Sequence, residues 1–66
     1  MDTRELRAAM LLADKTSKDL AKMWGVTVQT ARKKINGTAT MTVKEADETM
    51  TLLKLTPEGA GKIFFG

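Results

Sequence analysis

Helix-start signals recur along this 66-residue chain and divide it into short segments. The sequences T-S-K-D from residue 16 and T-V-K-E from residue 42 are capping boxes, in which a threonine is followed three residues later by an acid. Thr56-Pro57 is another start, because proline is favoured at the first helical position. Asp2 with Glu5 is a similar start near the N-terminus. These signals predict an all-α fold, a compact bundle of five short helices in a single domain over residues 1–66.

Apolar residues between these starts follow the i, i+3, i+4, i+7 spacing of amphipathic helices. Gly25 and Asn36-Gly37 are predicted stops, since glycine adopts the left-handed conformation after a helix without a Cβ clash. Residues 38–41 are predicted to form a loop. The residues expected to face inward, helix by helix, are Leu6, Ala9, Met10 and Ala13; Leu20, Ala21 and Trp24; Ala31 and Ile35; Val43, Ala46, Met50 and Leu53; and Ala60, Ile63 and Phe64.

The composition argues against catalysis. The chain contains no cysteine, no histidine and no tyrosine, so disulfides and cysteine- or histidine-based zinc sites are excluded. Its only serine, Ser17, is at a helix start, and no glycine-rich phosphate loop is present. We therefore expect neither an enzyme nor a bound metal or cofactor. No apolar run approaches the ~20 residues of a membrane span, which predicts a cytoplasmic protein without membrane contact.

Charge is distributed unevenly along the chain, whose net charge is +3. Residues 20–44 contain no acid, although they include Lys22, Lys44 and the run Arg32-Lys33-Lys34. Taken alone, three adjacent cations on a helix are most simply explained as a solvated face. The segregation of charge into the middle of the chain instead favours an anionic partner for that part.

The same middle part has the pattern of a helix-turn-helix. A predicted helix over residues 17–24 is followed by the turn Gly25-Val26-Thr27 and by a second helix over residues 28–36. Ala21 is small, which allows the second helix to cross close to it. Val26 fills the space between the helices, and Ala31 and Ile35 anchor the second helix to the core.

Residues 16–38, TSKDLAKMWGVTVQTARKKINGT, resemble the phage repressor and Cro family of helix-turn-helix proteins. The ending TPEGAGKIFFG is also similar to small prophage-encoded Cro-like regulators. The resemblance implies a lambda-repressor-like domain with its motif at about residues 16–37. It also implies a transcriptional regulator in a bacterial host cell, which acts as a homodimer on near-palindromic double-stranded operator DNA. Ser17 departs from the pattern, because the family has glutamine there. The matching residues are Thr16, Leu20, Ala21, Gly25, Val26, Thr27, Asn36 and Gly37.

In this family the second helix enters the major groove while the first lies across the DNA backbone. The resemblance therefore assigns the predicted helix over residues 28–36 to base recognition. The expected base contacts are Val28, Gln29, Arg32 and Lys33. The expected phosphate contacts are Ser17, Thr27, Thr30, Lys34, Asn36 and Thr38.

The C-terminal segment is the predicted protein interface. A two-turn helix cannot bury both Phe64 and Phe65 in one small core, and exposed apolar patches mark interfaces. The candidate residues are Leu55, Ile63, Phe64 and Phe65. An alternative function stays open: an antirepressor-type module that binds a partner phage repressor and modulates its DNA binding.

Overall fold

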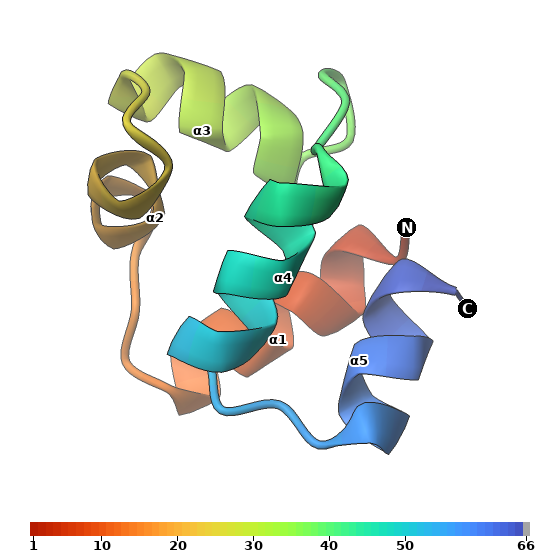
Figure 1. The fold of residues 1–66 in the computed structure, drawn as a ribbon. Coiled ribbons are helices and arrows are strands. Elements are labelled where there is room, and N and C mark those ends of the chain that lie inside the picture. Colours follow the sequence, from red (N-terminus) through yellow and green to blue (C-terminus); the bar gives the residue numbers. More distant parts are fainter. Residues whose placement is uncertain (66) are drawn as a thin grey trace.

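The computed structural model describes residues 1–65, and within them every regular element is a helix (Figure 1). This confirms the predicted all-α class with five helices. The bounds agree with the predicted starts, and the third helix ends one residue earlier than expected. The helices are α1 (Thr3–Leu12), α2 (Ser17–Trp24), α3 (Val28–Ile35), α4 (Val43–Leu52) and α5 (Pro57–Phe64).

Four of the helices, α1, α3, α4 and α5, begin where a side chain accepts from backbone N–H groups that have no partner within the helix. The Asp2 carboxylate accepts hydrogen bonds from the N–H groups of Arg4 and Glu5 at the start of α1. The hydroxyls of Thr27, Thr42 and Thr56 accept from the N–H group three residues ahead in α3, α4 and α5. The predicted helix starts are therefore real caps. At α2 the Asp19 carboxylate accepts from the Thr16 N–H at 2.8 Å.

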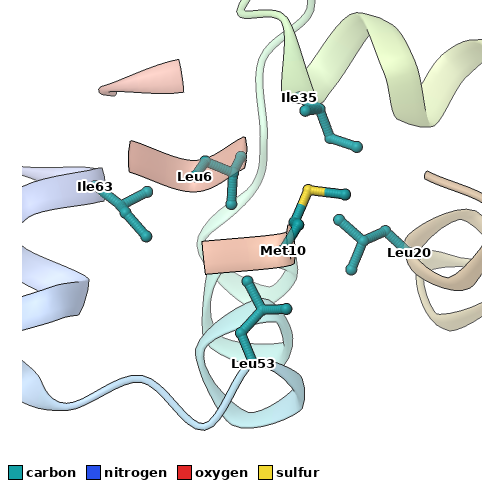
Figure 2. Packing of buried hydrophobic residues seen from close by; sticks show 6 residues of the cluster. All are labelled: Leu6, Met10, Leu20, Ile35, Leu53 and Ile63. Atoms are coloured by element: carbon teal, nitrogen blue, oxygen red, sulfur yellow. The ribbon is translucent and has the colours of Figure 1, made fainter. Parts of the chain in front are cut away.

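The core lies where all five helices meet. Figure 2 shows side chains that converge from α1, α2, α3, α5 and the residue after α4. α2 and α3 share the most extensive contact, while α1 packs on α3 and α5. The start of α1 lies beside the last turn of α5, because the Asp2 N–H donates to the Ile63 carbonyl at 2.7 Å. The cluster consists of Leu6, Met10, Leu20, Ile35, Leu53 and Ile63, each at most 7% exposed.

The predicted inward face of α4 is wrong over the first two turns. Val43 is 89% exposed, and Ala46 and Met50 are only half-buried. The buried residues of this helix are instead Glu45 and Thr49. Both are polar, and burial is tolerated because each has hydrogen-bond partners. The Thr49 hydroxyl donates to the Glu45 carbonyl at 2.7 Å, and the partners of the Glu45 side chain are described below.

No helix within residues 1–65 combines the length and the apolar character that crossing a bilayer requires.

Candidate nucleic-acid interface

The turn between α2 and α3 has the features predicted for a helix-turn-helix. Gly25 ends α2 in the left-handed conformation with φ of 71°, and the Val26 N–H donates back to the Ala21 carbonyl at 3.0 Å. Ala21 and Ala31 are both buried, so small side chains lie where the two helices cross. Figure 1 shows α2 nearly end-on while α3 runs across the view. The turn therefore sets α3 across the direction of α2, at one edge of the molecule.

The outer face of α3 carries most of its polar side chains. Gln29, Arg32 and Lys33 are exposed, while Ala31 and Ile35 are buried against the other helices. This division follows from the 3.6-residue period of the helix. Val28, at the first position of α3, is half-buried. Three of the four predicted base-contacting residues are therefore free to reach a partner, and Val28 presents only part of its surface.

The structure places Lys34 elsewhere than predicted. Its ammonium forms an ion pair with the Glu45 carboxylate, with 2.5 Å between Nζ and Oε2, and its side chain is only 13% exposed. The same ammonium lies 5.9 Å from the centre of the Trp24 ring, within the range of a cation–π contact. Lys34 therefore faces α2 and α4. The prediction that it reaches a DNA phosphate is corrected, because its charge is already matched inside the protein.

The Glu45 carboxylate is the centre of this contact between α2, α3 and α4. The second oxygen of this carboxylate accepts from the Thr42 N–H at 2.9 Å. The backbone carbonyl of Glu45 accepts from the Trp24 indole N–H at 3.3 Å. The Lys34 ammonium and then the Thr42 N–H lower the pKa of the Glu45 carboxyl from its ordinary value of 4.5. Glu45 is therefore ionised at neutral pH, and it fixes α3 against α4 from the inner side.

Several predicted phosphate contacts already have hydrogen bonds within the protein. The Thr27 hydroxyl donates to the Thr30 hydroxyl at 2.9 Å, so the hydrogen of Thr30 stays available to a ligand. The Thr38 hydroxyl donates to the Lys33 carbonyl at 3.1 Å, where it caps the end of α3. The Asn36 side-chain oxygen accepts from the Arg7 guanidinium, which leaves the Asn36 amide hydrogens free.

An open cleft of about 360 Å³ lies between α1, α2 and α3. Ser17, at the start of α2, forms part of its wall together with the cations Arg7, Lys15 and Arg32. Arg7 and Lys15 were not predicted to belong to this surface. Arg7 lies 29 residues before its partner Asn36, and no local pattern reveals that the fold brings α1 beside the end of α3.

The residues predicted as a protein interface at the C-terminal end differ in their exposure. Phe65 is 89% exposed, whereas Ile63 is 2% exposed and belongs to the core. Leu55 and Phe64 are half-buried and pack against that core. Ile63 is therefore excluded as an interface residue, because its side chain is buried in the core of its own chain.

Comparisons with family models, with curated proteins and with solved structures gave no match to this chain. The resemblance of residues 16–38 to the phage repressor and Cro family therefore stays a prediction. The functional argument depends on the geometry and charge of α2 and α3.

Proposed function

We propose that this protein is a sequence-specific DNA-binding transcriptional regulator of the phage repressor and Cro type, with a lambda-repressor-like arrangement of its helices. One observation carries the proposal. After the Gly25 turn, α3 buries Ala31 and Ile35 and presents Gln29, Arg32 and Lys33 outward. A projecting helix with an uncharged donor–acceptor side chain and two cations on its outer face fits the major groove of DNA.

Each exposed side chain of α3 has a base-edge partner of matching chemistry. The Gln29 amide can donate and accept at once, which suits the N6 and N7 atoms of adenine. Arg32 and Lys33 offer N–H donors to the O6 and N7 acceptors of guanine. Val28, at the tip of α3, offers part of its apolar surface to a thymine methyl group. Thr27 and Thr30 lie in the same first turn and would meet the sugar–phosphate backbone beside the groove.

The cleft beside α2 would hold the adjacent DNA strand. Arg7 and Lys15 add positive charge to a wall that also contains the N-terminal residue of α2, Ser17. Backbone N–H groups and the helix dipole at such a terminus favour an anion. Asn36 would add its amide hydrogens. These contacts position the protein along the duplex without reading its sequence.

The experiment is selection from a pool of random duplexes, followed by titration of the best duplex with the protein by fluorescence anisotropy. Affinity should fall as salt rises, because each neutralised phosphate releases counterions. Arg32→Ala should lose about 1–3 kcal/mol of discrimination at one base pair. Lys62→Ala, which removes an exposed cation on α5, is the matched control and should leave sequence preference unchanged. Binding without sequence preference, or no binding at low salt, would refute the proposal.

A second candidate is the antirepressor-type module that binds a partner phage repressor. The observation in its favour is a pair of adjacent leucines at the end of α1: Leu11 is 81% exposed and Leu12 is 89% exposed. Adjacent exposed leucines favour contact with another protein. A mobility-shift titration with the flanking genomic DNA separates the candidates. No shift by this protein alone, together with a change in the shift that the partner repressor produces, would favour the antirepressor.

A further inference from the structure

Two open hollows, of about 300 Å³ and about 580 Å³, lie along the C-terminal half of α4. The smaller lies between α4 and Met23 of α2, and the larger lies between the end of α4 and the chain at the end of α1. Thr51 and Leu52 belong to both, so the two hollows form one groove, which we call the α4 groove. In Figure 1 its walls lie on the side of α4 that faces α2 and the end of α1.

The two ends of the α4 groove carry opposite charges. Asp47 and Glu48 line the hollow beside α2, whereas Lys15 and Lys54 line the hollow beside the end of α1. Within residues 1–65 the only ion pair lies elsewhere, between α3 and the first turn of α4, so none of these four charges is matched by a partner. Asp47 and Lys54 are seven positions apart, which is about two turns or about 10 Å along α4.

The backbone of Lys54 is in a conformation that disfavours a side chain. Its φ is 52°, in the left-handed region just after α4, where residues other than glycine are uncommon. The left-handed positions after α2 and α3 are instead occupied by Gly25 and Gly37, which have no Cβ to clash. The chain thus has a lysine where glycine would be less strained, and this favours a role for the Lys54 cation at the end of the groove.

The middle of the α4 groove is apolar and concave. Ala13, Met23 and Leu52 are half-buried in its walls, and no large hydrophobic residue that is exposed in the described chain lines it. A second copy of the chain would therefore bring one hollow against another and leave both unfilled. A convex segment that carries apolar side chains between two opposite charges would fill the groove and match both of its ends.

We propose that the α4 groove binds an amphipathic helix of a partner protein, which carries an acid and a base two turns apart on the face that it buries. Positions i, i+3, i+4 and i+7 of a helix lie on one face. A charge at i and the opposite charge at i+7 then meet Lys54 and Asp47, while apolar residues at i+3 and i+4 cover Leu52. Exposed ion pairs add little affinity, but wrongly placed charges exclude a partner, so the charges of the helix decide whether it binds.

This partner site goes beyond the proposed DNA contacts. Gln29, Arg32 and Lys33 do not line the α4 groove, so a chain that is bound to DNA through α3 still presents it. Lys15 lines both this groove and the cleft beside α2. The experiments therefore change Lys54 instead, and they contain no DNA.

Three synthetic peptides test the proposal. They share one helical sequence with the same apolar face and differ only in the charged residues at positions i and i+7, which are glutamate and lysine, two glutamates or two lysines. Each carries a fluorophore and is titrated with the purified chain by fluorescence anisotropy. The peptide with glutamate and lysine should bind at least about tenfold more tightly than either of the others, because only it meets an opposite charge at both ends.

Charge reversal at one end of the groove should shift this preference. Lys54→Glu adds an acid to the basic end and should shift the preference toward the peptide with two lysines. Asp47→Lys should shift it toward the peptide with two glutamates. Lys62→Glu is the matched control, because Lys62 is an exposed cation of α5 that does not line the groove. It should leave the order of the three peptides as in the wild type.

Lys54→Gly separates binding from folding. It removes the cation and also the strain of a side chain at positive φ, so it should raise the urea concentration at the midpoint of unfolding. The same variant should bind the peptide with glutamate and lysine several-fold more weakly. A lysine that served only the fold would not give a gain in stability together with a loss of binding.

Three results would overturn the proposal. The first is equal binding of the three peptides, and the second is no binding up to about 1 mM. The third, from sedimentation equilibrium of the chain alone, is a self-associated state that Lys54→Glu weakens and Lys62→Glu does not, which would assign the groove to a second copy. None of these results bears on base recognition by α3, which the Arg32→Ala titration tests separately.

Discussion

The α2–α3 pair and the α4–α5 pair are built from helices of similar length but distribute their side chains in opposite ways. In α2 and α3 the fully buried residues are the apolar Leu20, Ala21, Ala31 and Ile35, and the outer faces are polar or charged. In α4 the residues that point inward include an acid and a threonine. Around α4 and α5, Val43 and Phe65 point into solvent.

The difference shows that burial in α4 is decided by a neighbour and not by its own pattern. Glu45 is tolerated inside because Lys34 comes from α3 to meet it and because Thr42 caps the same carboxylate. With Glu45 and Thr49 turned inward, the helix must turn other residues outward. Val43 is exposed as a consequence, and an apolar surface is left on the second pair. A polar contact between the two pairs, from Lys34 to Glu45, thus accompanies the apolar surface of the second pair.

The largest expected effect is a difference in the free energy of unfolding between two separate truncations. One truncates an inward residue of the first pair, and the other truncates an outward residue of the second pair. Ile35→Ala should lower the free energy of unfolding by about 2–5 kcal/mol, because it leaves a cavity in the core. Val43→Ala should change it by less than about 0.5 kcal/mol, as is usual for exposed positions. Urea unfolding followed by circular dichroism, at protein concentrations low enough to keep the chain monomeric, measures both. Equal losses would mean that Val43 is buried after all.

Two adjacent lysines of α3 allow an inward and an outward side chain of the same type to be compared. Lys34→Ala removes the partner of a buried carboxylate and should cost about 1–3 kcal/mol of stability. Lys33→Ala removes an exposed cation and should cost less than about 0.5 kcal/mol.

In a DNA titration the two lysine variants should rank in the opposite order, with the larger loss of affinity for Lys33→Ala. Lys33→Ala should weaken binding, while Lys34→Ala, compared at a temperature where it is fully folded, should leave the salt dependence near that of the wild type. If Lys34→Ala is as stable as Lys33→Ala, the ion pair with Glu45 does not hold α3 against α4.

The sequence was sufficient to predict the helices because their starts and stops are local. A threonine hydroxyl that caps the N–H three residues ahead, or a glycine in the left-handed conformation, acts within one turn of chain. The outer face of α3 was predictable for the same reason, since Ala31 and Ile35 fix its orientation and the remaining positions follow from the helical period.

The sequence was insufficient where two distant segments decide the outcome. Lys34 lies between Lys33 and Ile35 in a basic run, and nothing local distinguishes it from its neighbour. Its pairing with Glu45 depends on how α3 crosses α4. Arg7 and Lys15 join the cleft beside Ser17 only because α1 packs on α3. The α4 groove arises in the same way, from the approach of the end of α1 to α4.

The smallest expected effect is a loss of folding stability as the pH falls, which arises at the first turns of α2 and α4. The hydrogen bonds from Thr16 lower the pKa of the Asp19 carboxyl, as the contact with Lys34 lowers that of Glu45. A carboxyl whose pKa is lowered in the folded state stabilises the fold above its ordinary pKa, and this stabilisation is lost as the pH falls through the lowered value. Stability should therefore decline from about pH 4.5 downward.

Single amide variants, studied by urea unfolding between about pH 7 and pH 3, show which helix start contributes more to this decline. Glu45→Gln should flatten it more than Asp19→Asn, because Glu45 is buried beside a lysine whereas Asp19 is exposed and its charge is screened by water. At neutral pH Glu45→Gln should be less stable than the wild type, and the gap should narrow on acidification as the wild-type carboxylate is protonated. A gap that stays constant with pH would show that the charge of Glu45 contributes nothing and that only its hydrogen bonds hold the start of α4.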